Sequence, residues 1–67
     1  MNELKLRQKM LEKHVQNKDI ANKLGISKSA VQRKLNGSSE FSRAELKQLI
    51  SLLNLSPNEV IAIFFES

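Results

Sequence analysis

Apolar residues recur every three or four positions along this chain, in short segments separated by residues typical of helix caps and turns. One segment opens with SRAE, where Ser42 and Glu45 have the spacing of a capping box at the start of a helix. Its apolar residues follow at helical spacing: Leu46, Leu49, Ile50 and Leu53. No segment shows sustained alternation of apolar and polar residues, so the pattern predicts an all-α fold without a sheet.

Five short helices are expected. In chain order they occupy residues 3–13, 18–24 and 28–35, and two further segments that follow the serines at positions 42 and 56. Asn17 is expected to be the N-cap of the second helix and Ser27 that of the third. Pro57, in SPNE, suits the first position of the last helix.

A chain of 67 residues is expected to form one small domain over residues 1–67, and domains of this size bury only about 60% of their unfolded surface. The core must therefore be compact, and no room is left for a large catalytic cleft. The expected core consists of apolar residues at helical spacing: Leu6, Ile20, Leu24, Val31, Phe41, Leu46, Leu49, Leu53 and Val60.

Composition argues against several classes of function. With no cysteine and a single histidine, neither a disulfide nor a metal site of His and Cys ligands is expected. Asp19, Glu40 and Glu45 fall at helix starts, where capping explains them, so an enzyme is the poorest interpretation. No apolar run reaches the roughly 18 residues of a membrane span, and the first residues lack signal-peptide character. We therefore expect a cytoplasmic protein without cofactor, small-molecule ligand or membrane contact.

Positive charge is concentrated in the first half of the chain. Residues 1–37 carry nine lysines and arginines against three acids, whereas residues 38–67 carry two against four. A basic face suits a polyanion, because each neutralised phosphate releases counterions and contributes about −0.9 to the slope of log K against log salt. The alternative is that these lysines only solvate the outer faces of helices.

Residues 17–37, NKDIANKLGISKSAVQRKLNG, place a glycine between two amphipathic runs. Gly25 can adopt the positive φ that a helix needs when it ends in a sharp turn. Ala21 is small enough to let the second helix pack closely across the first. The neighbouring apolar residues would fill the wedge between the two helices: Ile20, Leu24, Ile26 and Val31. A small residue, a glycine four positions later and an aliphatic residue six after that are typical of a helix-turn-helix.

The same stretch resembles the helix-turn-helix of the phage Cro and repressor family, also called XRE-type regulators. The resemblance rests on the fragment GISKSAVQRKLNG and on six matching positions: Ala21, Gly25, Ile26, Val31, Asn36 and Gly37. The plan of five helices extends it over nearly the whole chain, and the closing EVIAIFF resembles short Cro-like regulators. The resemblance implies a lambda-repressor-like fold. It also implies a transcription regulator that binds a near-palindromic operator in double-stranded DNA as a dimer.

By this resemblance, residues 28–35 form the recognition helix, which enters the major groove of DNA. The base-reading residues would be Lys28, Ser29, Gln32 and Arg33. Their chemistry agrees, since lysine and arginine donate to guanine O6 and N7, and glutamine donates to and accepts from adenine. Gln32 and Arg33 have the side chains best suited to reach bases, whereas Lys28 has a phosphate as its alternative partner.

The family also contacts phosphates from the start of the second helix and from the loop after the recognition helix. Asn17 would have this role, or would be a plain N-cap. The other residues expected to contact the DNA backbone are Lys18, Ser27, Lys34, Asn36, Gly37, Ser38, Ser39 and Arg43.

Three departures from the family pattern change what can be carried over. His14 stands where glycine is common, which predicts a left-handed turn rather than a metal ligand. Met10 and Leu35 occupy the positions of an arginine–glutamate pair, which predicts an apolar contact in its place. The short loop over residues 38–41 contains Glu40 and lacks the basic residues that some relatives direct toward the minor groove.

The C-terminal segment holds more apolar residues than one short helix can bury. Residues 61–65, IAIFF, cannot all point toward the same small core. Exposed apolar clusters often mark association surfaces, so a weak homodimer through the tail 55–67 is expected. Its contacts would come from Leu55, Pro57, Ile61, Phe64 and Phe65. The alternative is that the tail folds back onto the first helix.

A protein-interaction module is the alternative function: an antirepressor or adaptor that keeps this fold and binds another regulator. Such a protein could dispense with basic and amide side chains on the recognition face, whereas this chain keeps Lys28, Gln32 and Arg33. Binding of single-stranded RNA usually relies on exposed aromatic side chains that stack on bases, and these are not expected here.

Overall fold

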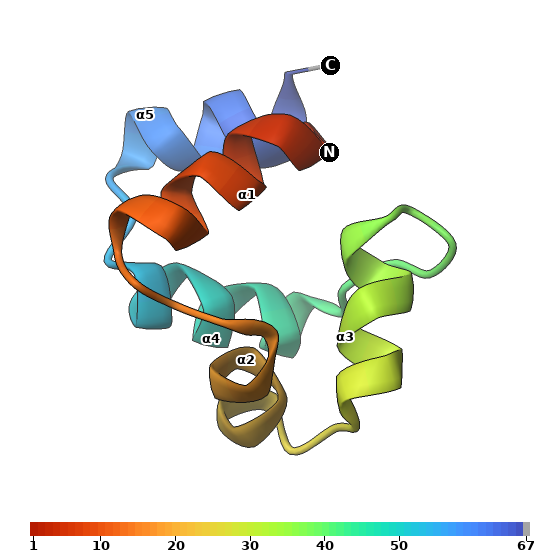
Figure 1. Cartoon of the computed structure of the whole chain (residues 1–67). Coiled ribbons are helices and arrows are strands. Elements are labelled where there is room, and N and C mark those ends of the chain that lie inside the picture. The colour runs from red at the N-terminus through yellow and green to blue at the C-terminus, as the bar shows by residue number, and fades with distance from the viewer. Residues whose placement is uncertain (67) are drawn as a thin grey trace.

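The structure is a computed structural model and describes residues 1–66, which contain helices and turns but no strand. Figure 1 shows the elements in chain order: α1 (Glu3–Glu12), α2 (Asn17–Leu24), α3 (Lys28–Leu35), α4 (Arg43–Leu53) and α5 (Pro57–Val60), which continues into the π-helical turn η1 (Ile61–Phe65). The predicted all-α fold of five helices is confirmed. Ser67, the last residue of the predicted domain and tail, lies outside the described residues.

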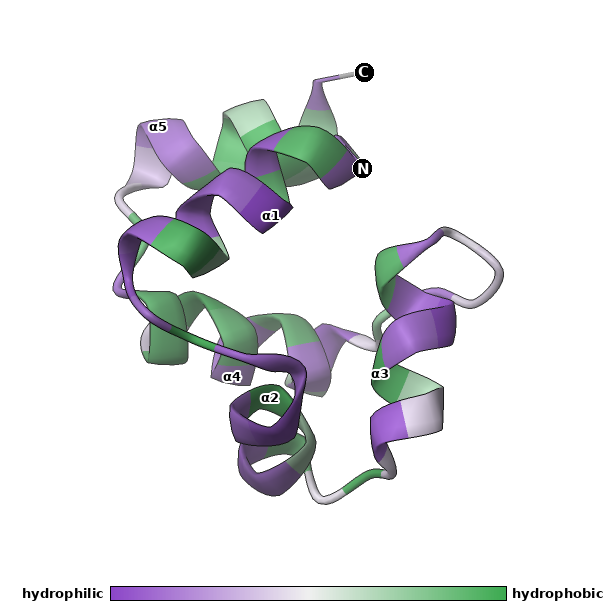
Figure 2. Ribbon diagram, viewed as in Figure 1, coloured by the Kyte–Doolittle hydropathy of each residue, from purple (hydrophilic) through white to green (hydrophobic). Residues whose placement is uncertain are grey.

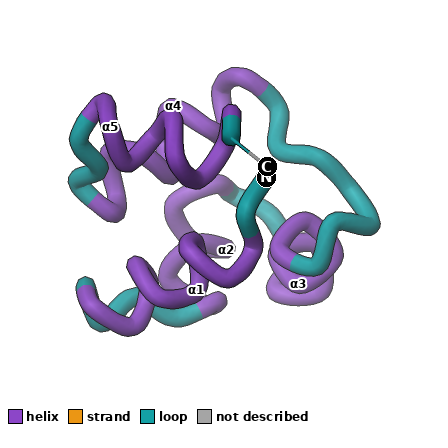
Figure 3. The backbone as a smooth tube through the Cα atoms, turned by 90° about the horizontal axis from the view of Figure 1, so that it is seen from above, coloured by secondary structure: helices purple, strands orange, loops and turns teal. Residues whose placement is uncertain are grey.

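Helix α4 crosses the middle of the molecule in Figure 1 and separates two helical pairs, and in the view from above in Figure 3 α3 stands at the edge, beside the long loop that follows it. On one side α2 packs against both α3 and α4, and on the other α1 packs against η1. The backbone N–H of Asn2 donates to the carbonyl oxygen of Ile63, which joins the start of the chain to its last turn. The turn between α2 and α3 is thus held at the end of the molecule opposite α1 and η1, as Figure 1 shows.

The core lies between α4 and the helices around it, and the apolar colour along α4 in Figure 2 marks its centre. Of residues 1–66, ten are buried: Leu6, Met10, Ile20, Ala21, Val31, Leu35, Leu49, Leu53, Leu55 and Ile63. Of the predicted core residues, Leu24, Phe41 and Val60 are only partly buried against this cluster, and Leu46 is half-buried. Met10 and Leu35 belong to the same apolar cluster, in line with the predicted replacement of an ion pair.

Serine side chains begin three of the helices as predicted. Ser27 Oγ accepts from the N–H of Ala30 at 3.0 Å, and Ser42 and Ser56 each form a capping box with the glutamate three residues later. The prediction that Asn17 is an N-cap was wrong, because Gln16 has that place and Asn17 is the first residue of α2. Asp19 accepts from the N–H of Gln16 at 2.8 Å, so a carboxylate three residues ahead supplies the capping contact.

Four residues have left-handed backbone conformations, each at the end of a helix or in a turn. Gly25 has φ 71° and Gly37 has φ 87°, while His14 and Asn54 have φ 58° and 52°. The left-handed turn predicted at His14 is therefore confirmed. It ends α1 at Glu12, one residue before the predicted end, and turns the chain toward α2.

Lys9 joins the first and last helices through an ion pair. Its ammonium group contacts Glu59 of α5 and lies 3.2 Å from Glu12 of its own helix. Hydrogen bonds from Lys9 and then from the backbone N–H of Ser56 lower the pKa of Glu59 from its usual 4.5 to about 2. The hydrogen bonds to Glu59 and Glu12 correspondingly raise the pKa of Lys9 above its usual 10.5.

The ion pair makes stability depend on pH in acid. Folding lowers the pKa of Glu59, so the ionised carboxylate stabilises the folded state. This contribution to the free energy of unfolding is fully present above about pH 4.5 and is lost as the pH falls through about 2. We expect Glu59→Gln to melt a few degrees below the wild type at pH 7, with a gap that closes as the pH falls from about 5 to about 2. Thermal unfolding followed by circular dichroism measures this gap.

Lys9→Met serves as the matched control for the ion pair. It should reproduce the pH-dependent gap, and the double variant should melt close to either single variant because each removes the same contact. A gap between Glu59→Gln and the wild type that stays constant from pH 7 to pH 2 would contradict the assignment.

Candidate nucleic-acid interface

The turn between α2 and α3 is built by its backbone. The N–H groups of Gly25 and Ile26 both donate to the carbonyl oxygen of Ala21, at 2.9 and 3.1 Å. A Cβ added at Gly25 would meet no atom within 4 Å, so the position requires a positive φ rather than empty space. Ser27 then starts α3 at once. The glycine and the serine together fix the direction in which α3 leaves the turn.

The inner faces of α2 and α3 hold the two helices together. Ile20, Ala21 and Val31 are buried, and Leu24 and Ile26 are partly buried beside them. Burying this face leaves the opposite side of α3 in contact with solvent. In Figure 1, α3 stands at the edge of the molecule.

The outer side of α3 carries all four residues predicted to read bases. Lys28, Ser29, Gln32 and Arg33 are exposed, and their spacing along the helix places them in one stripe. No carboxylate lies between residues 20 and 39, so this stripe is free of negative side chains from its own helix and from most of α2. The structure thus brings the four residues together on one accessible face, and their role stays a prediction.

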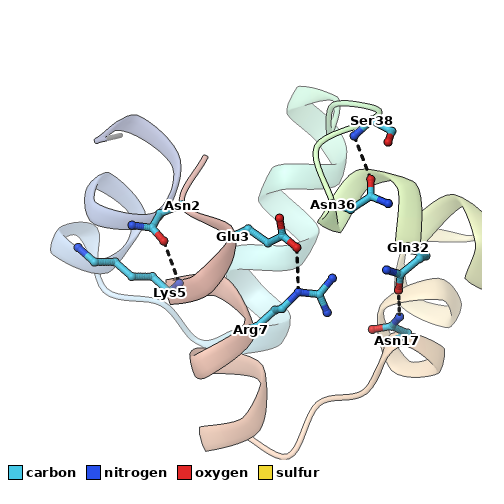
Figure 4. A network of polar contacts seen from close by, with 8 residues as sticks. All are labelled: Asn2, Glu3, Lys5, Arg7, Asn17, Gln32, Asn36 and Ser38. Carbon is cyan, nitrogen blue, oxygen red and sulfur yellow. Dashed lines mark hydrogen bonds and ion pairs between the residues drawn. The ribbon is translucent and has the colours of Figure 1, made fainter.

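One of these four side chains is tied to the neighbouring helix. Nδ2 of Asn17, at the start of α2, donates to Oε1 of Gln32 at 3.1 Å, as Figure 4 shows. Asn17 is half-buried and Gln32 is exposed. Sequence reasoning assigned a separate role to each residue and missed the contact, since they lie 15 positions apart and no local pattern joins them.

The loop after α3 uses its own backbone donors. Oδ1 of Asn36 accepts from the N–H of Ser38 at 3.0 Å, and the N–H of Ser39 donates to the carbonyl oxygen of Arg33 at 3.2 Å (Figure 4 shows the first of these). The N–H of Gly37 faces the carbonyl oxygen of Lys34 at 3.4 Å. A phosphate at this loop would therefore be met mainly by the side chains of Asn36, Ser38 and Ser39. Lys18, Ser27 and Arg43, also predicted to contact the DNA backbone, are exposed.

Lys34 belongs to the fold rather than to the exposed stripe. Its ammonium group donates to the carbonyl oxygen of Glu40 at 2.9 Å and to Oε1 of Glu45 at 3.0 Å, and lies 5.8 Å from the centre of the Phe41 ring. Hydrogen bonds from the backbone of Ser42 and then from Lys34 lower the pKa of Glu45 below its usual 4.5. Lys34, whose contact with DNA stays a prediction, thus ties the end of α3 to the loop and to α4.

An open groove of about 450 Å³ lies between this loop and the two ends of the chain. Its apolar lining includes Phe41, Leu46, Phe64 and Phe65. Of the residues predicted to form a dimer, Phe65 is 71% exposed, Ile61 is 49% exposed and Pro57 is exposed, while Phe64 is half-buried against the core. Leu55 is only 9% exposed because it fills the core of the single chain, which corrects its placement in the predicted interface.

Other kinds of site find no support in the described part of the chain. Residues 1–66 contain no group of three His, Cys, Asp or Glu side chains that could hold a metal ion. None of the helices described is long and apolar enough to cross a membrane. The exposed stripe of α3 is the candidate functional site because it gathers Lys28, Ser29, Gln32 and Arg33 on one accessible face.

Comparison with known proteins agrees with the geometry of this segment. Neither the comparison with curated proteins nor the comparison with solved structures found a match. Residues 6–60 match the helix-turn-helix family, a stretch that runs from α1 to the end of α5 and includes the whole of α2 and α3. The chain therefore belongs to the XRE-type helix-turn-helix family of DNA-binding regulators.

Proposed function

We propose that the protein is a sequence-specific transcription regulator, a Cro-like phage or prophage repressor that binds a near-palindromic operator as a homodimer. The observation that carries the proposal is the exposed stripe of α3, which offers Lys28, Ser29, Gln32 and Arg33 and no carboxylate. An antirepressor or adaptor would have no need of this combination of basic and amide groups on one face.

The stripe supplies the donors that base edges in the major groove require. Arg33 can donate two parallel hydrogen bonds to O6 and N7 of guanine, and Lys28 can donate to the same atoms or to a phosphate. Ser29 is short and can either donate or accept. A good bidentate pair contributes about 1–3 kcal/mol of discrimination against the wrong base, so two such pairs would give a useful reader.

The DNA backbone would be held on both sides of the stripe. The proposed contacts come from the exposed or half-buried side chains of Lys18, Ser27, Asn36, Ser38, Ser39 and Arg43, and from the exposed backbone at Gly37. Residues 17–35 contain four lysines and one arginine but only one acid. This excess of positive charge provides the field that attracts the duplex. Lys34 is left out of this set because its ammonium group is bound to Glu40 and Glu45.

Selection of bound sites from random duplex DNA tests the proposal. We expect enrichment of two inverted half-sites whose centres lie about one helical turn (~34 Å) apart, the spacing that a symmetric dimer reads. Binding to the enriched site should weaken steeply with salt, with a slope of about −0.9 per neutralised phosphate. Binding that is equally strong to all sequences, or absent, would overturn the proposal, and absence would favour the adaptor.

The dimer would use the groove at the chain ends and the exposed apolar side chains of η1. Phe65 and Ile61 are among the five large apolar side chains that the described chain leaves exposed, and Phe65 lines the groove together with Phe41. Two copies joined through the apolar part of this groove would cover Phe65 and Phe41 while leaving the exposed stripe of α3 free for DNA. Asn36, Gly37 and Ser39 line the other side of the groove, so the loop after α3 would lie at the edge of the interface, next to the DNA. Leu55 takes no part, since it is buried within each chain.

Phe65→Ser is therefore expected to shift the sedimenting species toward the monomer. It should weaken binding to an operator with two half-sites by at least tenfold and have little effect on binding to DNA with a single half-site. Analytical ultracentrifugation with and without DNA measures both effects. Leu11→Ser is the matched control, because Leu11 is 78% exposed on α1 and is not among the residues that line the groove. If Phe65→Ser dimerised as strongly as the wild type, the dimer interface would have to lie on another surface.

A further inference from the structure

The loop between α3 and α4 carries three of the exposed or half-buried side chains proposed to contact phosphates: Asn36, Ser38 and Ser39. Its internal hydrogen bonds tie it to itself and to α3. Asn36 accepts from the N–H of Ser38, and the N–H of Ser39 donates to the carbonyl oxygen of Arg33. Neither of these bonds reaches α4, so the far end of the loop depends on another contact.

The side chain of Lys34 supplies that contact. Its ammonium group donates to the carbonyl oxygen of Glu40, in the loop, at 2.9 Å and to Oε1 of Glu45, in the first turn of α4, at 3.0 Å. The side chains of Lys34 and Glu45 are only 14% and 17% exposed, so water and salt screen this pair less than a pair on the open surface. Charged hydrogen bonds of this kind are roughly twice as strong as neutral ones. Lys34 thus fastens the end of the loop to α4.

The carboxylate of Glu45 serves two partners at once. Its Oε1 also accepts from the N–H of Ser42 at 2.8 Å, as part of the capping box of α4. Hydrogen bonds from Ser42 and then from Lys34 lower the pKa of Glu45 below its usual 4.5, so this carboxylate is ionised at neutral pH. The same oxygen therefore fixes both the start of α4 and the end of the loop.

We propose that Lys34 is a positioning residue for DNA binding, one that holds the loop after α3 ready to receive a phosphate. The proposal rests on the function proposed above. An untied loop would have to be ordered when DNA binds, and the lost conformational freedom would weaken binding. Because Lys34 fastens the loop during folding, Asn36, Ser38 and Ser39 are presented to DNA without that cost. Lys34 itself contacts no phosphate, since its charge is engaged by Glu45.

The alternative is that Lys34 binds a phosphate directly, in which case Glu45 competes with DNA for its charge. Glu45→Gln separates the two roles, because glutamine keeps an oxygen that caps α4 but replaces the charged hydrogen bond to Lys34 by a neutral one. If Lys34 positions the loop, binding to a half-site obtained from the site selection should weaken about threefold, although a negative charge has been removed. If Lys34 binds a phosphate, the released ammonium group should make binding tighter.

Glu40→Gln is the matched control for charge. The Glu40 carboxylate is exposed in the same loop and makes no ion pair with the described residues. The substitution leaves the backbone carbonyl oxygen that Lys34 binds in place. This variant should bind the half-site as tightly as the wild type or slightly more tightly. Opposite signs in Glu45→Gln and Glu40→Gln would mean that the contact with Lys34, and not charge alone, governs binding.

The double variant Lys34→Met, Glu45→Gln removes the contact without changing the net charge. It should bind a single half-site about five- to tenfold more weakly, with the base preferences of the wild type and an unchanged slope of log K against log salt. Loss of a phosphate contact would instead reduce this slope by about 0.9. Lys34→Arg should retain most of the affinity, because a guanidinium can donate to both oxygens. A single half-site keeps dimerisation out of the measurement, since Lys34 also lines the groove at the chain ends.

Hydrogen exchange measured by NMR reports on the loop directly. In Lys34→Met the N–H groups of Ser38 and Ser39 should exchange at least about fivefold faster than in the wild type, because their hydrogen bonds lie in the released loop. The N–H of Leu49, a buried residue of α4, should keep its protection, which separates release of the loop from loss of global stability. Lys47→Met removes an exposed lysine of α4 and is the matched control, expected to leave all three amides unchanged.

Three results would overturn the inference. One is binding of Glu45→Gln that is as tight as that of Glu40→Gln or tighter, which would make Lys34 a phosphate contact. Another is wild-type affinity in the double variant, which would mean that fastening the loop does not matter for DNA. The third is unchanged exchange of Ser38 and Ser39 in Lys34→Met. Failure of the proposed function is separate, because it would show as the absence of any enriched site in the wild type.

Discussion

Leu35→Ala is expected to lower the free energy of unfolding by about 2–5 kcal/mol, the largest effect on stability among the variants considered. Leu35 is the last residue of α3 and is fully buried. Truncation removes apolar contacts and leaves a cavity in a core that Met10 and Leu53 also line. A domain of 67 residues has a total stability of roughly 3–10 kcal/mol at 0.05–0.15 kcal/mol per residue, so this loss would unfold a large fraction of the molecules.

Urea unfolding followed by circular dichroism measures the change. Leu11→Ala is the matched control, because it removes the same atoms from a leucine that is 78% exposed on α1, and it should change the stability by less than about 0.5 kcal/mol. Similar losses in the two variants would mean that Leu35 does not hold α3 to the core. Wherever Leu35→Ala remains folded, it should retain the base preferences of the wild type, because its side chain does not face solvent.

Arg33→Ala is expected to weaken binding to the preferred operator by about tenfold to a hundredfold and to abolish the preference at one base pair in each half-site. Arg33 is exposed on α3, and it is the one residue of the stripe with a planar fork of donors that matches guanine O6 and N7. Fluorescence anisotropy with labelled duplexes, together with repeated site selection, measures affinity and preference separately.

Lys5→Ala is the control for charge in this experiment. It removes one positive charge from the exposed surface of α1, a helix that packs against η1 rather than forming part of the helix-turn-helix. It should leave the base preferences intact and weaken binding only slightly. If Arg33→Ala weakened all sequences equally and kept every preference, Arg33 would be a phosphate contact and the reading residues would have to be sought elsewhere.

The positions of the helices could be predicted because they depend on local chemistry. Ser27, Ser42 and Ser56 cap the helices that follow them, and the left-handed turns at Gly25 and His14 lie where the sequence placed them. The exception is the start of α2, where Asn17 was chosen as N-cap for its side-chain type. Asp19, three residues after Gln16, was the signal that could have identified the true N-cap.

The candidate site was predictable as a set of exposed residues but not as a set of contacts. Helical spacing sufficed to place Lys28, Gln32 and Arg33 on one face of α3. The bonds from Asn17 to Gln32 and from Lys34 to Glu45 join residues 15 and 11 positions apart, and they depend on how the helices cross. Sequence patterns carry no information on that crossing.

For the C-terminal segment, too, the sequence predicted what depends on local composition but not what depends on the packing of the helices. An excess of apolar residues over what a short helix can bury was evident, and Ile61 and Phe65 are indeed exposed. Which of the others point inward depends on the widening of the last helix into the π-helical turn η1, where Ile63 is buried and Phe64 is half-buried. Leu55 follows the left-handed Asn54 at the end of α4, where its N–H donates to the carbonyl oxygen of Ile50, and its burial beyond this turn was not evident from the sequence.

The empty surroundings of Gly25 have a stereochemical consequence. Because a Cβ in the position of an L-residue would meet no atom within 4 Å, an L-residue at Gly25 would be opposed by the positive φ and not by lack of space. A D-amino acid at this position, introduced by chemical synthesis, would prefer the positive φ that an L-residue resists, and it would restrict the unfolded chain more than glycine does. The joint between α2 and α3 is thus a place where a D-residue could stiffen the protein without altering any side chain of the exposed stripe.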